Sequence, residues 1–175
     1  MLSKELVCLV NRYHPSGFIT LVTKKEDNMN LFQEAQVVPE RAYGEIQIGE
    51  QASLTKTITD EDIQAFAKLT GDVNPVHLLD SFAQTTMFKE RIAHGMLVAS
   101  LISAVLGTKL PGKNTIYLSQ NVSFKAPVKI GDTVTVIAEV VQKRDDKKIM
   151  TLETNVYNQH KKLVVAGSAV VMKME

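Results

Sequence analysis

The chain has 175 residues, of which 45% are hydrophobic and 22% charged, and its formal net charge is +1. A chain of this length can form one domain with a self-sufficient hydrophobic core. The small net charge and the mixing of both signs exclude the basic field that nucleic acid or an anionic membrane surface would require. Cys8 is the single cysteine, so the chain cannot form an internal disulfide. Such a chain is typical of a reducing compartment, and we expect the cytoplasm, with the mitochondrial matrix as the alternative.

The apolar segments are too short to span a bilayer. The longest run covers residues 96–106, whereas a membrane helix needs about 20 apolar residues. A shorter run near the start, residues 6–10, is followed by Asn11 and Arg12 rather than by the small residues of a signal-peptide cleavage site. We therefore predict no membrane span and no secretion signal.

Residues 1–45 form an N-terminal extension of unclear structure. Two apolar runs flank the turn-forming residues 14–17, so an edge hairpin is one interpretation. A leader that the domain does not use is a second interpretation, and a native start at Met29 is a third. Regular patterning begins at Ile46, and we expect one domain over residues 46–175.

The first patterned segment predicts a strand and then a helix. Apolar and polar residues alternate over residues 52–58, as in a half-buried strand. Thr59 and Asp62 have the spacing of a helix-capping box, and the acidic residues at 60–62 favour a helix N-terminus. Gly71 is suited to the left-handed conformation that ends a helix. The sequence therefore predicts a helix between Thr59 and Gly71.

Turn formers follow this helix. Pro75 keeps Asn74 out of the helical region, so the chain must bend sharply within residues 72–77. A short helix that packs Phe82 and Ala83 is expected within residues 80–88.

The next segment, residues 96–106, is apolar on almost every face, which predicts a helix surrounded by protein. We expect this helix to end at Gly107.

The last third of the chain has the period of strands. Turn signals separate its apolar or β-branched segments at hairpin spacing, so we expect an antiparallel meander. No helix interrupts these strands, which excludes a parallel βαβ arrangement. The preceding apolar helix is the natural cover for one face, and this predicts an α+β fold in which a curved antiparallel sheet wraps around one long central helix. The expected strands are residues 116–124, 133–141, 150–157 and 163–172.

Polar side chains gather on the turn at 72–77. Asp72 and His77 lie at its two ends and can converge on one small volume, while Asn74 can hold the turn through hydrogen bonds to the main chain. Each residue alone is more often structural than functional. Together, a carboxylate and an imidazole can hold one water, as general acid–base chemistry near neutral pH requires.

A second group complements this pair. Gly95 stands at the start of the predicted apolar helix, where main-chain N–H groups are unpaired and the helix dipole is positive. Because glycine has no side chain, a substrate oxygen can approach its N–H closely, as an enolate-like oxygen would. The helix behind it offers an apolar wall, with Ser100 and Ser103 as its polar points.

Two segments together carry a family resemblance. Residues 71–77 (GDVNPVH) and 92–96 (IAHGM) closely resemble the MaoC-like (R)-specific enoyl-CoA hydratase family, which has the hot-dog fold. The resemblance runs from about Ile46 to Met172, and it leaves residues 1–45 uncovered. Further matching segments are residues 117–120 (YLSQ), 124–128 (FKAPV) and 130–132 (IGD).

The resemblance implies reversible hydration of a trans-2-enoyl thioester to the (R)-3-hydroxyacyl thioester. Asp72 and His77 would activate the water and return a proton to the α-carbon, and the Gly95 N–H would polarise the thioester carbonyl. The division of proton transfers between Asp72 and His77 stays open, because a coupled pair titrates as a unit. The carrier would be CoA or acyl carrier protein, and no metal or organic cofactor is implied.

Other residues of the motifs would support this site. Asn74 would orient the turn, Ser103 matches a family serine near the pocket, and His94 and Met96 flank Gly95 in the second motif. The resemblance also implies a homodimer whose sheets join at their edges, with candidate edges at residues 116–124 and 163–172.

Three rival interpretations remain at this point. A hot-dog thioesterase would favour an acidic residue on the central helix, and residues 96–106 contain none. A non-catalytic acyl-thioester-binding subunit would leave positions 72 and 77 free to vary. A metal site built from Asp72, His77 and His94 has a spacing that fits no standard zinc pattern.

Overall fold

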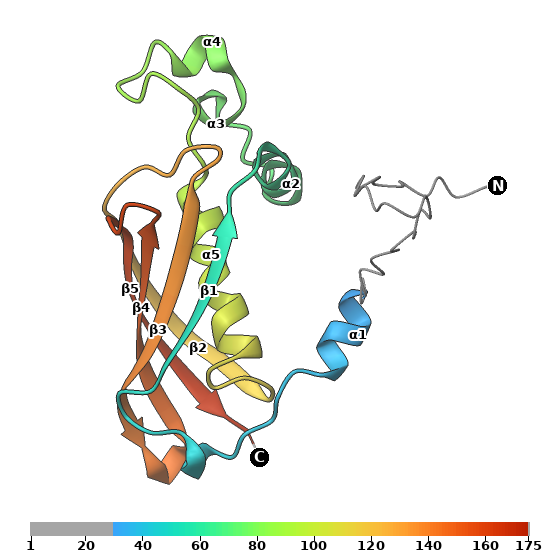
Figure 1. Ribbon diagram of the computed structural model, residues 1–175, viewed down its shortest axis with the longest axis vertical. Coiled ribbons are helices and arrows are strands. Elements are labelled where there is room, and N and C mark those ends of the chain that lie inside the picture. Colours follow the sequence, from blue (N-terminus) through green and yellow to red (C-terminus); the bar gives the residue numbers. More distant parts are fainter. Residues whose placement is uncertain (1–29, 175) are drawn as a thin grey trace, which may run out of the picture.

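The computed structural model describes residues 30–174. Within this part of the chain, one antiparallel sheet curves around a long helix, α5 (Gly95–Thr108). Three shorter helices, α2 (Asp60–Thr70), α3 (Pro75–Leu78) and α4 (Asp80–Ala83), gather at the end of the sheet where α5 begins (Figure 1). The predicted α+β fold, a hot-dog domain with a curved sheet around a central helix, is confirmed. The expected hairpin at 14–17 and the proposed start at Met29 lie outside the described residues.

The sheet has five strands in the order β1-β3-β4-β5-β2. Consecutive pairing of β3, β4 and β5 confirms the predicted meander for the last three strands, and β1 pairs with β3, as Gln51 does with Glu139. The strands are β1 (Gln51–Thr57), β2 (Thr115–Phe124), β3 (Thr133–Arg144), β4 (Ile149–Asn158) and β5 (Leu163–Lys173).

The position of β2 differs from the prediction. It pairs with β5 at the far edge of the sheet rather than with β3, so a four-strand meander and an edge at residues 163–172 were both wrong. The connection over residues 125–132 is long enough to pass two strands and reach β3. It is held there because the Ala93 N–H donates to the Val128 carbonyl at 2.8 Å. The two edges are therefore β1 and β2.

The core lies between α5 and the inner face of the sheet. Ile102 of α5 and Val136, Leu152 and Ala169 of the strands are fully buried, and burial of such a side chain stabilises the fold by about 1.5–3 kcal/mol. One stripe of α5 faces outward instead, and Met96 on it is 57% exposed. The prediction that this helix is surrounded by protein is therefore wrong for a single chain.

The helix α2 (Asp60–Thr70) has the predicted ends. Its capping box is reciprocal, because the Asp62 N–H donates to Thr59 Oγ1 at 3.2 Å and the Thr59 N–H donates to the Asp62 carboxylate at 3.0 Å. Gly71 ends the helix in the left-handed conformation, with φ +79°. Buried Ile63 fastens the helix to the core, so α2 gives the following turn a fixed starting point.

Two short helices follow the turn, α3 (Pro75–Leu78) and α4 (Asp80–Ala83). The second is shorter than predicted, and Phe82 is 44% exposed, so its expected packing was wrong, whereas Ala83 is buried. Further along, α5 continues through Thr108, one residue past the predicted end, because the Lys109 N–H still donates to the Val105 carbonyl.

Three small elements lie outside the sheet and the central helix. Before β1 come α1 (Leu31–Gln36), which buries no residue, and the short helix η1 (Tyr43–Glu45). Tyr43 belongs to the core and lies under the Lys143 ammonium group. The third element, η2 (Asp145–Lys147), joins β3 to β4.

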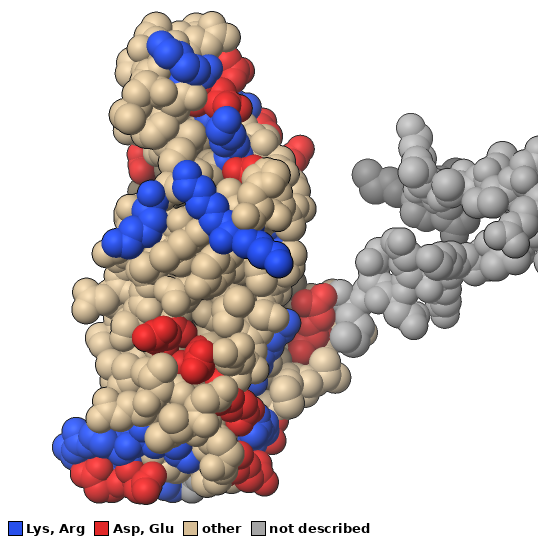
Figure 2. All heavy atoms as spheres, turned by 60° about the vertical axis from the view of Figure 1, so that its left-hand side comes forward, with Lys and Arg blue, Asp and Glu red and all other residues tan. Residues whose placement is uncertain are grey.

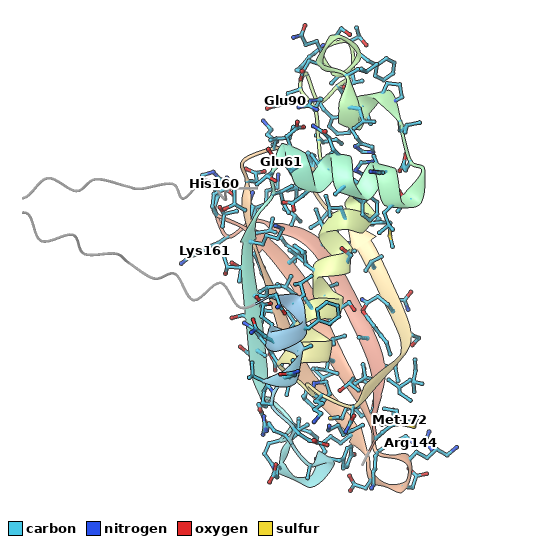
Figure 3. All side chains as sticks on the ribbon, turned by 90° about the vertical axis from the view of Figure 1, so that its right-hand side faces the viewer. Glu61, Glu90, Arg144, His160, Lys161 and Met172 are labelled. Carbon is cyan, nitrogen blue, oxygen red and sulfur yellow. The ribbon has the colours of Figure 1, made fainter. Side chains whose placement is uncertain are left out.

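Charged side chains of both signs occur on the surface. Figure 2 shows one face on which basic and acidic groups adjoin in the upper part and at the lower end. At the end marked by Glu61 and Glu90 in Figure 3, Arg91 lies 2.8 Å from Asp60 of α2 and 3.1 Å from Asp80 of α4. This pairing holds the small helices together near the start of α5. Among the described residues, we find no helix with the length and hydropathy that a membrane crossing needs.

Candidate active site

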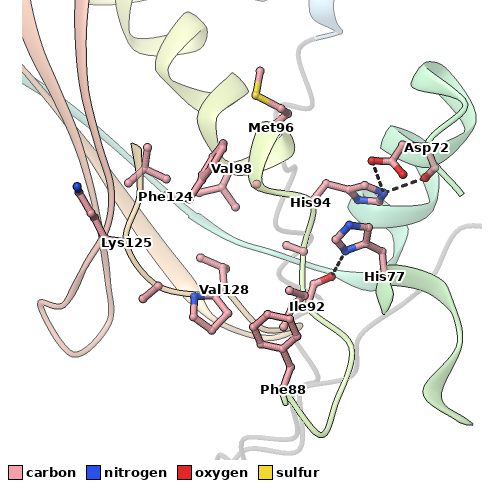
Figure 4. A pocket seen from close by; sticks show the side chains of 15 residues that line it. Asp72, His77, Phe88, Ile92, His94, Met96, Val98, Phe124, Lys125 and Val128 are labelled. Atoms are coloured by element: carbon pink, nitrogen blue, oxygen red, sulfur yellow. Dashed lines mark hydrogen bonds and ion pairs between the residues drawn. The ribbon is translucent and has the colours of Figure 1, made fainter. Parts of the chain in front are cut away.

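A cavity of about 450 Å³ lies where the turn at 72–77 meets the start of α5. Most of its wall is apolar; Asp72, His77 and His94 lie together on one side, and Lys125 lies on the opposite side (Figure 4). Apolar surroundings strengthen the interactions of a few polar groups, as small-molecule sites require. The polar lining residues are Asp72, His77, His94 and Lys125, and the apolar ones include Phe88, Val98, Phe124 and Val165.

Local hydrogen bonds shape the turn. The Asp72 N–H donates to Thr70 Oγ1, and the Asn74 N–H donates to Asp72 Oδ1, both at 3.2 Å. Asn74 in turn accepts from the Val76 N–H at 3.4 Å and caps α3, which Pro75 begins. Asn74 thus supports the turn without lining the cavity, while the half-exposed Asp72 carboxylate faces the cavity.

His77 stands on α3 with one ring nitrogen already used. Its Nδ1 lies 2.8 Å from the Ile92 carbonyl, and because a carbonyl only accepts, Nδ1 carries the proton and Nε2 keeps a lone pair in the neutral ring. Burial lowers the pKa of His77, and charge on His94 adds to this effect, while the Ile92 carbonyl and Asp72 oppose it. His77 is therefore a neutral base near pH 7.

His94 is the last residue before α5 and is 2% exposed. Its Nε2 donates to the main-chain oxygen of Asp72 at 3.0 Å and lies 4.0 Å from Asp72 Oδ2. Its ring lies 3.9 Å from the ring of His77. One side-chain nitrogen or oxygen atom from each of Asp72, His77 and His94 lies within 4.8 Å of the other two. The structure thus brings Asp72 and His77 together as the turn predicted, with His94 beside them.

Gly95 is the first residue of α5, so its N–H has no acceptor inside the helix. A Cβ built on Gly95 would lie 2.8 Å from Cε1 of Phe124. Glycine here therefore also makes room for this aromatic ring, which is 52% exposed at the cavity wall. The sequence assigned Phe124 no role, and its only signal was its place in the segment at 124–128.

The three polar side chains also raise the question of a metal site. Carboxylate and imidazole are possible ligands, and a zinc ligand nitrogen must direct a lone pair at the ion. Here Nδ1 of His77 and Nε2 of His94 each carry a proton that is donated to a carbonyl. A metal ion could take His94 Nε2 only by breaking its bond to Asp72, whereas Nε2 of His77 keeps a free lone pair.

Ser103 lies outside the cavity that holds Asp72 and His77. It lines a second hollow of about 390 Å³ between α5 and β2, and Met96 lines both. Beside it, the Gln120 side chain accepts a hydrogen bond from the Tyr117 hydroxyl and donates one to Oγ1 of buried Thr154. The structure thus brings Gly95, His94 and Met96 to the first cavity and leaves Ser103 in the neighbouring one.

The fold and this cavity define a hot-dog domain with an acid–base pocket at the start of its central helix. Residues 45–162 match the family model described as the MaoC like domain, and the chain belongs to this family. The resemblance seen in the sequence is confirmed.

Known relatives agree with this membership. An (R)-specific enoyl-CoA hydratase of Rhodospirillum rubrum is 51% identical over 130 residues, which are 74% of this chain and 90% of that protein. Another, of Aeromonas caviae, is 49% identical over 126 residues, or 72% and 94% of the two chains. The solved structure of an unliganded R-hydratase from Pseudomonas aeruginosa has a TM-score of 0.73 at 49% identity, covering 76% of this chain and 85% of that one.

Proposed function

We propose that this protein catalyses the reversible addition of water to trans-2-enoyl thioesters, which gives (R)-3-hydroxyacyl thioesters. The observation that carries the proposal is the meeting of Asp72, His77 and the first residue of α5 in one largely apolar cavity. The names of the two hydratase relatives support the same reaction and favour CoA as the thioester carrier. No metal or organic cofactor takes part in the proposed reaction.

The two sides of the cavity divide the chemistry. Asp72 and His77 hold the water, and the free lone pair of His77 Nε2 accepts its proton as the water oxygen bonds to C3. The displaced electrons move to the thioester oxygen, where the Gly95 N–H and the helix dipole stabilise the charge. Return of a proton to C2 completes the addition, so one water is consumed and nothing else.

The test is an assay of the purified protein with crotonyl-CoA. Loss of the conjugated enoyl thioester, release of free thiol and the configuration of the product are followed together. We expect the enoyl signal to disappear without thiol release, and the product to be the (R)-3-hydroxy isomer. Thiol release in step with that loss would instead identify a thioesterase, and neither change would leave a binding subunit. The same assay with crotonyl-acyl carrier protein decides the carrier.

The role of His77 as the base is tested by His77→Gln. This change should lower turnover by at least about 100-fold, because it removes the base. His160→Gln, in the exposed turn before β5, is the matched control, and it should keep the rate of the unchanged protein. Near-native turnover of His77→Gln would refute the assignment.

We also propose that the protein is a homodimer joined at the β2 edge. Exposed apolar side chains of β2, among them Tyr117 and Leu118, lie beside exposed Met96 of α5, and an edge strand of this kind is normally covered. Light scattering at micromolar concentration should give twice 19.4 kDa, and Leu118→Lys should lower this mass. A fully active monomer would remove the proposal.

We place the protein in the cytoplasm, with the mitochondrial matrix as the alternative. The support is the single cysteine, Cys8, which is typical of a reducing compartment. Fractionation of cells that make the protein decides between the two locations.

A further inference from the structure

Two histidines of the site join the turn at 72–77 to the segment that begins α5, and each hydrogen bond runs in the opposite direction to the other. His77 belongs to the turn side and donates from Nδ1 to the carbonyl of Ile92, just before α5. His94 directly precedes α5 and donates from Nε2 to the carbonyl of Asp72, on the turn side. Each ring therefore reaches from its own segment to the main chain of the other, as Figure 4 shows.

The ring of His94 is enclosed. It is packed between His77, at 3.9 Å between ring centres, and Phe66 of α2, at 5.0 Å. Its Nδ1 is buried and has no hydrogen-bond partner among the described residues. An unpaired buried nitrogen destabilises a fold, so stability alone does not explain a histidine at this place. The atom that accounts for it is Nε2.

His94 also holds Asp72 in a way that no other described residue does. The remaining hydrogen bonds of Asp72 are local, to Thr70 and Asn74 within three positions of the chain. Only His94 joins Asp72 to α5, which carries Gly95. The water and the thioester oxygen are bound on these two different segments, so the distance between the segments fixes the distance between the reacting groups.

We propose that His94 is a positioning residue, which sets Asp72 and His77 at the correct distance from the Gly95 N–H and does not itself exchange a proton with the substrate. This inference rests on the proposed hydratase function. His94 acts through a hydrogen bond and a ring contact, and a displacement of about 1 Å between reacting groups can cost on the order of 100-fold in rate.

Burial is the main cause that lowers the pKa of His77, and His94 adds to it. The titratable groups lining the cavity are Asp72, His77, His94 and Lys125. Of these, a charge on His94 lowers the pKa of His77, and Asp72 raises it. Removal of His94 should therefore raise the pKa of His77, so the acid limb of the kcat/KM profile moves to higher pH.

Three substitutions separate the hydrogen bond from the ring. A glutamine amide nitrogen can reach the place of imidazole Nε2, an asparagine nitrogen only that of Nδ1, and phenylalanine keeps the ring without a donor. We expect His94→Asn and His94→Phe to lower kcat for crotonyl-CoA about 100-fold with little change in KM. The kcat of His94→Gln should be at least about tenfold higher than that of His94→Asn. His160→Gln should change neither constant.

Equal kcat values for the Gln and Asn variants, or native kcat in all three, would overturn the proposal. Melting temperatures show whether a variant is folded, and the shift of the acid limb in His94→Gln reports an effect that a purely structural role would not produce. NMR of the imidazole nitrogens is independent of turnover: His94 protonated at Nδ1 alone would also overturn it. A different result would refute the proposed function alone: the protein without substitutions fails to hydrate crotonyl-CoA, but His94 is protonated at Nε2. The hydrogen bond between His94 and Asp72 would then still be established.

Discussion

The two ends of α5 serve different purposes. At its start, His94 and Gly95 contact main-chain atoms of the turn and the ring of Phe124. Further along, residues such as Ile102 and Val105 are fully buried among apolar side chains. In the reaction proposed above, the polar end sets distances between reacting groups through a few directed contacts, and the apolar part supplies stability through buried area. Substitutions at one end should therefore change rate, and those at the other should change stability.

The largest effect is expected from Asp72→Asn. Loss of the carboxylate should lower turnover of crotonyl-CoA about 10²–10⁴-fold, because the water loses one of its two acceptors. The melting temperature should hardly change, since this side chain is half exposed. Asp146→Asn, at the opposite end of the sheet, is the control. A large drop in melting temperature would show that the polar end also carries the fold.

In the apolar part, Ile102→Ala should give the reverse result. The side chain is fully buried, and its truncation should reduce the free energy of unfolding by about 2–5 kcal/mol. Denaturant titration measures this loss, and kcat per folded molecule should stay near the native value. Val141→Ala, at a partly exposed position of β3, should cost much less. A proportional loss of kcat would contradict the separation of the two ends.

Gly95→Ala tests the contact between the polar end and β2. The new methyl group would meet the Phe124 ring, which must swing away, and we expect a loss in kcat/KM of about tenfold. Phe124→Ala in the same chain makes room for the methyl group and should recover part of the loss. No recovery would mean that the methyl group itself blocks the N–H.

The smallest effect concerns pH. Because burial lowers the pKa of His77, the acid limb of kcat/KM should lie below 6.5, its ordinary value. The unfolded chain then binds this proton at higher pH than the folded chain does, so the contribution of His77 to stability falls as the pH drops through about 6.5. NMR titration of the ring and pH-rate profiles measure the two quantities. An acid limb above 6.5 would contradict the lowered pKa.

Local rules predicted much of the fold. The ends of α2 were predictable because Thr59, Asp62 and Gly71 cap the helix through contacts with residues close to them in the sequence. The position of β2 in the sheet was not predictable, because an alternating pattern identifies a strand but does not show which strand it pairs with. The site divides in the same way. Asp72 and His77 share a short turn, so their meeting followed from the sequence, whereas the contacts of His94 with Asp72 and of Phe124 with Gly95 depend on how distant segments pack.

The pairing of β2 with β5 has a consequence for the order of assembly. On the ribosome, β2 emerges together with α5, but its partner β5 follows only after β3 and β4, since Thr115 pairs with Lys173 and Phe124 with Val165. Such long-range pairing forms slowly, because a large loop must close first. Phe124 reaches its place over Gly95 only when β5 has been added. The cavity, which Val165 of β5 also lines, is therefore complete only after β5 has been made, and a nascent chain that lacks β5 carries both site motifs without a complete pocket.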